Sequence, residues 1–296
     1  MTATTLTGAE AARAINATVA ARVGAAVDQG VQPPRLTVVS ATDDEASAWY
    51  VRSIARAAAR VGIDCQVTTL APDADADADD QLIGETLRGL SQDPQIHAVM
   101  LQTPLPAGRA LTDFSPFIAP EKDVDGANPL SLGRLTAGLP AFAPATAEAV
   151  VRILDHHGVK PAGRHVVVVG RSLVVGRPLL QLLLDRDATV TVCHSRSTDL
   201  KSLTRSADVL AVAAGRAGLI TPEYVAPGTV VVDVGTNPTP EGGLAGDVAP
   251  EVAEVAGALT PVPGGVGPVT TAVLMEHVLT AWERATDSRG ASRAGS

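Results

Sequence analysis

Residues 165–180, HVVVVGRSLVVGRPLL, decide the fold. The four consecutive valines form an apolar run that ends at Gly170, which is typical of a strand buried on both faces. A second glycine, Gly176, begins a helical segment that reaches about Leu184. A strand, a glycine-containing turn and a helix in this order form a βα unit, from which parallel sheets are built.

Three more apolar runs follow this unit, separated by helical or loop segments. Right-handed crossover connections place such runs in one parallel sheet. Before residue 144, shorter apolar runs also alternate with segments of helical periodicity, at 8–28, 47–61 and 81–91. The sequence therefore predicts an α/β protein whose strands are ATVTVC (188–193), DVLAVAAG (208–215) and GTVVVDVG (228–235) in the second half, and RLTVVSAT (35–42), CQVTTL (65–70) and HAVMLQTPLP (97–106) in the first.

The composition limits the classes of protein to which the chain can belong. The 296 residues are 46% hydrophobic but only 2% aromatic, so the expected core consists of small and β-branched side chains. A net charge of −9 argues against nucleic acid as a partner. Two cysteines, Cys65 and Cys193, are too few for a disulfide framework, and no apolar run is long enough for a membrane span. We expect a soluble protein of a reducing compartment.

The acidic run DADADADD (73–80) invites comparison with a cation site. Alternating Asp and Ala lack the ligand spacing of a calcium loop, so we interpret the run as a solvated turn that enters the next helix. No metal site is predicted.

The turn after the valine strand has the properties of a dinucleotide site. A glycine lets the backbone approach a pyrophosphate, and a helix start offers free amides. The next strand ends in CHSRS, where NAD-binding folds usually place a carboxylate on the ribose; here it carries Ser195 and Arg196, while Arg171 follows Gly170. Cations without a carboxylate favour the 2′-phosphate of NADP. The alternative, that these are solvated loop residues, stays open.

Several longer segments together resemble one known family. They are PEKDVDGANPLSLGRL (120–135), GRHVVVVGRSLVVGRP (163–178), DVGTN (233–237), GDV (246–248) and TPVPGGVGPVTTAVLMEH (260–277). They are similar, in order and nearly along the whole chain, to the bifunctional methylenetetrahydrofolate dehydrogenase/methenyltetrahydrofolate cyclohydrolases, the FolD family.

The resemblance implies a two-domain enzyme with its active cleft between the domains. Residues 1–143 would form a folate-side catalytic domain and 144–267 a Rossmann-like NADP domain. Residues 268–284 would form a helix that returns to the first domain, and 285–296 a disordered tail. Members are typically cytoplasmic homodimers that oxidise 5,10-methylenetetrahydrofolate with NADP and then hydrolyse the methenyl product to 10-formyltetrahydrofolate.

The resemblance also assigns roles to residues. Tyr50 would stack on the folate ring system, Asp125 would accept hydrogen bonds from the pterin, and Gln102 would orient the folate and the family's catalytic lysine. The remaining expected substrate residues are Pro263, Gly264, Gly265 and Gly267, and the family's cofactor positions fall on Gly170, Arg171, Ser172, Ser195, Gly215 and Thr236. The glycine turn and the CHSRS tip add Gly176 and Arg196 to the expected cofactor residues.

The chain departs from the family at the lysine itself. The family pattern Tyr-x-x-x-Lys places that residue at position 54, where this chain has Ile54. Four residues advance a helix by about 400°, so positions 50 and 54 project from one side. Isoleucine has no proton to exchange, whereas hydride transfer needs alignment and no obligatory proton transfer. We therefore expect any dehydrogenase activity to outlast the cyclohydrolase.

Other departures leave two alternatives open. The family's PCTPxG stretch is PATAEA here (144–149), and Thr42, Thr103 and Ala217 replace the usual Gly, Leu and Pro. Most of these changes concern the folate side, while the phosphate turn matches well. Such a pattern also fits a paralogue that acts on another folate or iminium substrate, or a non-catalytic folate- or NADP-binding protein.

Overall fold

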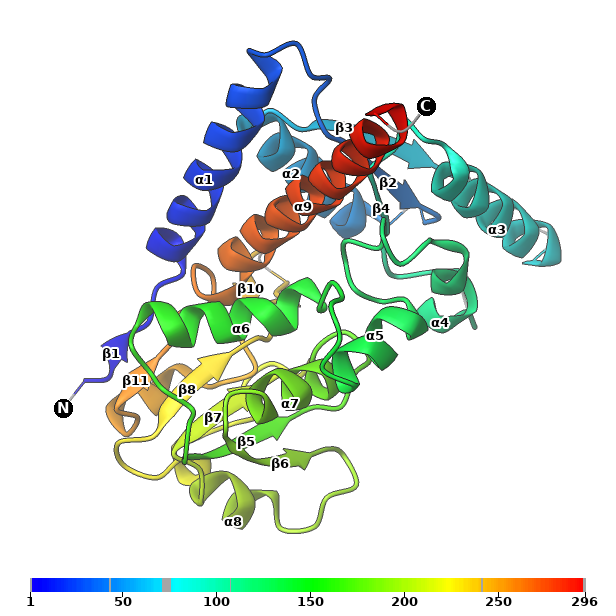
Figure 1. Cartoon of the computed structure of the whole chain (residues 1–296). Coiled ribbons are helices and arrows are strands. Elements are labelled where there is room, and N and C mark those ends of the chain that lie inside the picture. The colour runs from blue at the N-terminus through cyan, green and yellow to red at the C-terminus, as the bar shows by residue number, and fades with distance from the viewer. Residues whose placement is uncertain (1, 43, 71–75, 107, 241, 295–296) are drawn as a thin grey trace. The chain divides into compact units, whose positions relative to one another are not determined.

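The chain folds into two compact α/β units, each made of segments that are distant in sequence (Figure 1). A computed structural model describes residues 2–42, 44–70, 76–106, 108–240 and 242–294. Unit 1 comprises Met1–Arg13 and Pro144–Thr270, and unit 2 comprises Ala14–Ala143 and Thr271–Ser296. This arrangement confirms the predicted α/β class.

Unit 1 contains a six-stranded sheet in the order β1-β11-β8-β7-β5-β6, and every neighbouring pair is parallel. The chain reverses its direction of winding beside β5, because β6 lies on one side of this strand and β7 on the other. Ligands of open α/β sheets bind at such a switch point, beyond the carboxyl ends of the strands. The strands are β1 (Thr4–Thr5), β5 (His165–Val169), β6 (Thr189–Cys193), β7 (Val209–Val212), β8 (Val230–Asp233) and β11 (Ala258–Leu259).

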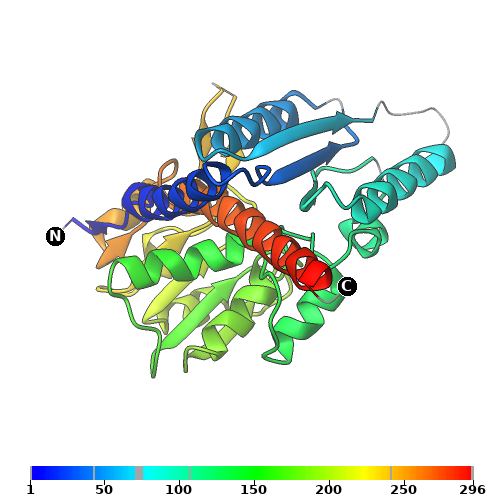
Figure 2. The same ribbon diagram turned by 45° about the horizontal axis from the view of Figure 1, so that its top comes forward.

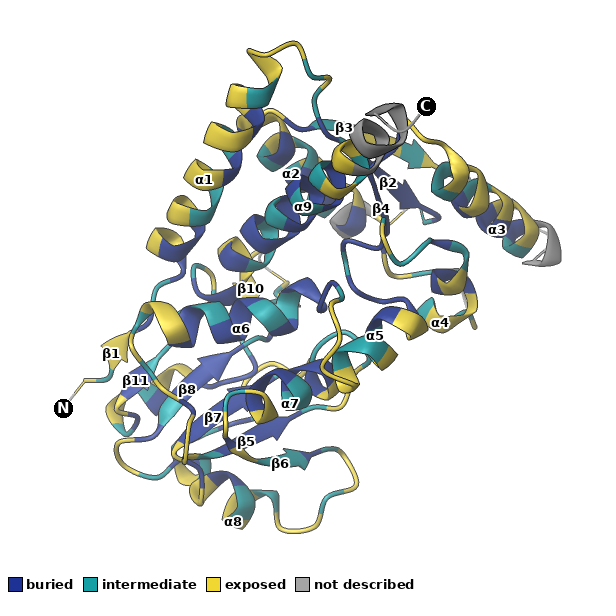
Figure 3. Ribbon diagram, in the orientation of Figure 1, coloured by how far each residue is buried: buried dark blue, intermediate teal, exposed yellow. Residues whose placement is uncertain are grey.

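The central strands of this sheet are apolar because both of their faces are covered. β7 is buried along its whole length, and β5 is buried from its second residue on (Figure 3). α7 (Gly176–Leu184) packs on β5 and β6, and α6 (Ala145–His156) packs on α7 (Figure 2). The PATAEA stretch forms the start of α6, where Ala145, Ala147 and Ala149 are all buried. These three alanines therefore serve packing.

Unit 2 contains a three-stranded parallel sheet in the order β3-β2-β4. The strands are β2 (Arg35–Ser40), β3 (Asp64–Thr69) and β4 (Ala98–Leu101). α2 (Glu45–Arg60) packs against β3, and α3 (Ala76–Gln92) packs against β4. The side chain of Asp44 caps α2 by accepting a hydrogen bond from the backbone N–H of Ser47, at 2.8 Å. This cap fixes the start of the helix that carries Tyr50.

The remaining elements are short, apart from two helices that cross the boundary between the units. α1 (Ala9–Val27) and α9 (Val266–Ala294) begin in unit 1 and continue into unit 2. No helix within the described ranges is long and apolar enough to cross a membrane. The short elements are α4 (Leu111–Phe114), η1 (Ser115–Phe117), α5 (Pro129–Thr136), α8 (Leu200–Arg205), η2 (Pro222–Tyr224), β9 (Asn237–Pro238), β10 (Leu244–Ala245) and η3 (Pro250–Glu254).

The structure differs from the expected domain boundaries at both ends of the chain. The first residues belong to unit 1, because β1 pairs with β11, whereas the sequence predicted one domain for 1–143. α9 continues to Ala294, so 285–294 are helical where a disordered tail was expected. This extension contains no proline, and most of its residues tolerate helix continuation once a buried helix precedes them. Residues 295–296 lie outside the described residues.

The acidic run at 73–80 is divided between two regions. Residues 73–75 lie outside the described residues, while 76–80 form the start of α3. The sequence predicted a solvated turn up to residue 80 and a helix from residue 81. The turn prediction is wrong for 76–80, because the helix begins at Ala76.

Candidate functional site

A cavity of about 450 Å³ lies at the carboxyl ends of β5, β6 and β7 in unit 1, at the switch point of the sheet. The turn after β5 forms one wall, the tip of β6 forms a second, and the loop after β7 forms a third. Its lining residues are Val169, Gly170, Arg171, Ser172, His194, Ser195, Ser197, Leu200, Ala213, Ala214, Arg216 and Leu219.

Two glycines allow the backbone of this turn to pack closely. Gly170 has a φ of +131°, and a Cβ there would lie 2.1 Å from the carbonyl oxygen of Ala213. A Cβ on Gly176 would lie 2.0 Å from the carbonyl oxygen of Gly170. Any side chain at either position would therefore separate β5 from β7 or from α7. The resulting cradle, with backbone N–H groups beside a helix start, fits a dinucleotide phosphate.

The buried carboxylate of Asp247 holds the loop after β7. Its Oδ2 accepts hydrogen bonds from the backbone N–H groups of Ala214 (2.6 Å) and Gly215 (2.9 Å). Its Oδ1 accepts one from the backbone N–H of Arg216 (2.8 Å) and one from the side-chain amide of Asn237 (2.9 Å). Asp247 is fully buried, so these four donors replace the water that a carboxylate needs.

A second buried carboxylate, Asp233 at the end of β8, fixes the position of Asp247. It accepts hydrogen bonds from the backbone N–H groups of Gly235 (2.9 Å), Asp247 (3.0 Å) and Val248 (3.0 Å). Burial raises the pKa of Asp233 to about 6, although these three bonds favour its charged form. The two aspartates thus connect three loops at one end of the sheet.

The structure brings together only some of the predicted cofactor residues. Gly170, Arg171, Ser172 and Ser195 line the cavity, and Gly215 belongs to the loop that Asp247 holds. Gly176 acts through packing. Arg196 and Thr236 are exposed and do not line the cavity. Arg196 was predicted from its place in the CHSRS tip after β6, whereas the cavity contains Arg216.

In unit 2, α2 presents two kinds of surface. Val51, Ile54 and Ala58 follow one another at intervals of three and four residues, and all three are buried. Ile54 is 0% exposed, so it belongs to the packed face of the helix. Tyr50, one turn earlier, is only half-buried, and Arg52 and Arg56 are exposed. No cationic side chain among these residues replaces a lysine at position 54.

Gln102 follows β4 and is 6% exposed. Its backbone N–H donates to the carbonyl oxygen of Val39 at 2.8 Å, and its side-chain Nε2 donates to the carbonyl oxygen of Thr103. The side-chain oxygen Oε1 is buried and has no hydrogen-bond partner among the described residues. A buried acceptor without a partner is costly in a folded protein, and a bound ligand that donates a hydrogen bond removes the cost.

The DVDG segment contains two aspartates that differ in burial and in hydrogen bonding. Asp123 is buried, and its carboxylate accepts hydrogen bonds from the backbone N–H groups of Ala127 (3.2 Å) and Asn128 (2.7 Å). Asp125 is half-buried, and among the described residues its carboxylate has no hydrogen-bond partner. Asp123 therefore shapes the loop, and Asp125 is left available for a ligand.

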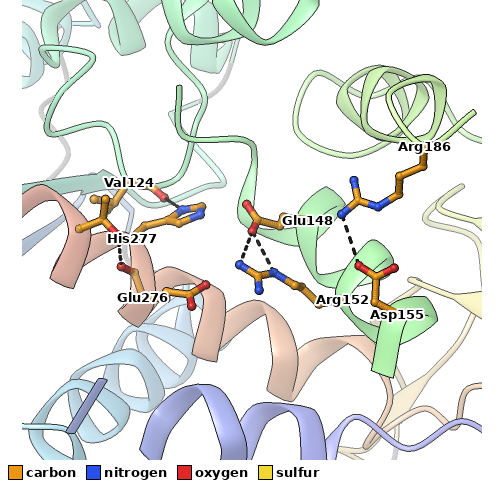
Figure 4. A network of polar contacts seen from close by, with 8 residues as sticks. Val124, Glu148, Arg152, Asp155, Arg186, Glu276 and His277 are labelled. Carbon is orange, nitrogen blue, oxygen red and sulfur yellow. Dashed lines mark hydrogen bonds and ion pairs between the residues drawn. The ribbon is translucent and has the colours of Figure 1, made fainter. Parts of the chain in front are cut away.

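The electrostatics of this loop connect Asp125 with Tyr50. Burial, together with the nearby charge of Asp123, raises the pKa of Asp125 to about 7, while His277 opposes the rise. Burial and the charge of Asp125 raise the pKa of Tyr50 to about 12. His277 Nδ1 lies 2.8 Å from the carbonyl oxygen of Val124 and therefore carries the proton (Figure 4). Tyr50 and Asp125 thus lie close enough for the charge of Asp125 to act on the Tyr50 hydroxyl, and their contact with a folate stays a prediction.

The loop with Pro263, Gly264 and Gly265 belongs to unit 1. Local backbone geometry requires glycine at two of its positions. Gly264 has a φ of +106°, and a Cβ on Gly265 would lie 2.6 Å from the carbonyl oxygen of Pro261. Gly267, in the first turn of α9, has open space around it. The structure thus explains two of these glycines by backbone geometry, and their predicted contact with substrate stays a prediction.

Four residues that organise these sites were not predicted from the sequence: Asp123, Arg216, Asp247 and His277. Asp247 stands in the GDV segment, which was recognised as a family segment without a role. The donors that Asp247 binds lie 10 to 33 residues away along the chain. No local pattern indicates such contacts.

Two family models match the chain. The model described as "Tetrahydrofolate dehydrogenase/cyclohydrolase, catalytic domain" matches residues 6–125. The model described as "Tetrahydrofolate dehydrogenase/cyclohydrolase, NAD(P)-binding domain" matches residues 144–286.

Curated relatives agree with these matches. The Bifunctional protein FolD 1 of Saccharopolyspora erythraea is 59% identical over 285 residues, which cover 96% of this chain and 96% of that protein. The Bifunctional protein FolD of Nocardia farcinica is 56% identical over 285 residues, which cover 96% of this chain and 99% of that protein.

Solved structures share the fold. The bifunctional enzyme FolD from Campylobacter jejuni has a TM-score of 0.89 and 34% identity, with 95% of this chain and 99% of that chain covered. The methylenetetrahydrofolate dehydrogenase-cyclohydrolase of Trypanosoma brucei, solved with NADP and an inhibitor, has a TM-score of 0.90 and 32% identity, with 97% and 99% covered.

Proposed function

The chain belongs to the tetrahydrofolate dehydrogenase/cyclohydrolase family, and we propose that it is an NADP-dependent 5,10-methylenetetrahydrofolate dehydrogenase with weak or absent cyclohydrolase activity. The proposal of weak or absent cyclohydrolase activity rests on the fully buried Ile54, one helical turn after Tyr50. The proposal of NADP-dependent dehydrogenase activity is supported by the match to the family's NAD(P)-binding domain and by the glycine cradle after β5.

The residues of unit 2 fit a folate. The ring of Tyr50 stacks on the pterin, and the free carboxylate of Asp125 accepts hydrogen bonds from the pterin's amino group and ring N–H. The unpartnered Oε1 of Gln102 accepts a further one. These contacts orient the methylene carbon between N5 and N10 of the folate, and NADP, when bound, accepts the hydride at its nicotinamide ring.

Hydride transfer gives a methenyl product with one positive charge and requires no proton transfer. Ile54 places no ammonium near this charge, so it does not oppose formation of the product. The cyclohydrolase step adds water to the methenyl carbon and releases a proton, for which a general base is needed. Position 54 provides none, because an isoleucine side chain has no ionisable group.

The purified protein should perform the two steps unequally. We expect NADP-dependent formation of methenyltetrahydrofolate from methylenetetrahydrofolate, and hydrolysis of preformed methenyltetrahydrofolate close to the uncatalysed rate. Absorbance of the methenyl product reports both reactions. Hydrolysis as fast as the oxidation would contradict the role given to position 54. Binding of NADP without either activity would favour another folate or iminium substrate.

Ile54→Lys should increase cyclohydrolase activity by about 10- to 100-fold, a part of what general base catalysis provides. Burial disfavours the charged form of an amine, so it lowers the pKa of the introduced lysine toward neutrality and makes it a base. Ile54→Met is the matched control, since methionine has an unbranched side chain like that of lysine but no ionisable group. Equal hydrolysis by the two variants would show that the other departures from the family limit this step.

Folate binding should depend on pH through Asp125. Its pKa of about 7 means that the carboxylate is ionised above and protonated below that pH. If the ionised form binds the pterin, affinity for tetrahydrofolate should fall about tenfold from pH 8 to pH 6. Anaerobic titration calorimetry measures this change. Asp125→Asn retains Asp123 and His277 and should bind weakly with little pH dependence, whereas an unchanged pH profile in this variant would assign the effect to those neighbours.

We also propose that the protein works as a cytoplasmic homodimer, as the family resemblance implies. Trp49 on α2 (55% exposed) and Val67 on β3 (44% exposed) are apolar side chains of unit 2 that are open to a partner. Sedimentation velocity should give a mass about twice the 30.1 kDa of the chain. A single species at the monomer mass over the micromolar range would refute this expectation.

A further inference from the structure

The cavity beside β5 is positively charged in a chain that is acidic as a whole. Its lining contains Arg171, Arg216 and His194 and no carboxylate side chain, although the chain has a net charge of −9. The carboxylate beneath the loop, on Asp247, is fully buried and is bonded to four N–H donors. An anionic group of the ligand therefore meets cations on the surface of this cavity.

Arg216 has an anchored backbone and a side chain that is available to bind an anion. Its backbone N–H points to Asp247 Oδ1 at 2.8 Å, while its side chain is exposed and lines the cavity. Among the described residues its guanidinium has no ion pair or hydrogen bond. By contrast, Arg205 donates from its guanidinium to the carbonyl oxygens of Glu223 and Val225. Arg216 can therefore give its full set of donors to a ligand.

The residues that line the cavity indicate which part of the nucleotide reaches Arg216. Leu200 and Leu219 provide apolar surface for a base, and Ser195 at the tip of β6 stands where dinucleotide folds contact the ribose 2′ position. Arg216 lines the same cavity, whereas Arg196 lies outside it. This placement favours the adenosine half of the cofactor, with its 2′-phosphate as the anion.

We propose that Arg216, together with Arg171, binds the adenosine 2′-phosphate and so determines the preference for NADP over NAD. Asp247 is the positioning residue, because it fixes the backbone of residues 214–216 from below. This proposal rests on NADP as the cofactor and assigns its recognition to a residue other than Arg196.

The decisive measurement is equilibrium binding, which is independent of turnover. Titration calorimetry with NADP, NAD, 2′,5′-ADP and 5′-AMP compares ligands that differ by the 2′-phosphate. Arg216→Ala should weaken NADP and 2′,5′-ADP by about 10- to 100-fold, as loss of a charged hydrogen-bonded pair predicts, and leave NAD and 5′-AMP within about twofold. Arg216→Lys should be intermediate, because it retains the charge without the planar fork.

Two further arginines serve as comparisons. Arg164 is exposed and precedes β5, at the opposite end of the strand from the cavity, so Arg164→Ala should leave all four affinities unchanged. Arg196→Ala should change the NADP preference much less than Arg216→Ala. The reverse order would overturn the proposal, and so would an equal loss of NADP and NAD binding in Arg216→Ala.

The role of Asp247 is tested by the same ratio of affinities. Asp247→Asn turns one acceptor oxygen into an N–H donor that faces other donors, so the loop loses its anchor. We expect the NADP preference to fall, and Arg216→Ala to cause no further fall in the double variant, because Asp247 acts through Arg216. Independent, additive losses in the two variants would overturn the positioning role. Circular dichroism shows whether each variant is folded, and a wild-type protein that binds NADP without turnover still permits every comparison.

Discussion

The site of unit 1 depends on close contact between three backbones at the end of β5. Gly170 approaches the carbonyl of Ala213 after β7, and Gly176 approaches the carbonyl of Gly170, each at a distance that excludes a Cβ atom. Because these contacts bring β5, β7 and α7 together, the three loops that line the cavity converge on one point. Larger residues would separate the strands and open the cavity to solvent. The cavity is therefore a consequence of backbone packing, and its side chains add selectivity.

Burial of charge complements this packing. Asp233 and Asp247 remain inside the protein because backbone N–H groups of neighbouring loops satisfy their oxygens. Each loop has little regular structure of its own, so the carboxylates replace the hydrogen bonds that a helix or a strand would supply. In unit 2, Asp123 performs the same task for the loop that presents Asp125. In both units, a buried aspartate organises the loop and an exposed or half-buried neighbour is available for the ligand.

The sequence allowed prediction of those parts of the structure that depend on local patterns. The valine strand, the glycine turn and α7 lie where periodicity and composition place them, since apolar runs and helix signals act over a few residues. β1 was missed because Thr4–Thr5 are polar and become a strand only through pairing with β11. Arg216 and Asp247 were missed for the same physical reason, since contacts between distant loops give them their roles. The burial of Ile54, too, follows from the side of α2 on which it lies, which the alignment of motifs does not reveal.

The pairing of β1 with β11 has a consequence for the synthesis of the protein. Thr4 pairs with Ala258, so the first strand leaves the ribosome long before its partner exists. At typical rates of translation this delay is on the order of 10 to 50 s. Unit 2 is also incomplete until its last segment, which begins at Thr271, has been made. Unit 1 therefore cannot close before β11 has been made, and unit 2 cannot close before the segment from Thr271 has been made. Until then, apolar strands such as β5 and β7 are exposed to association with other chains.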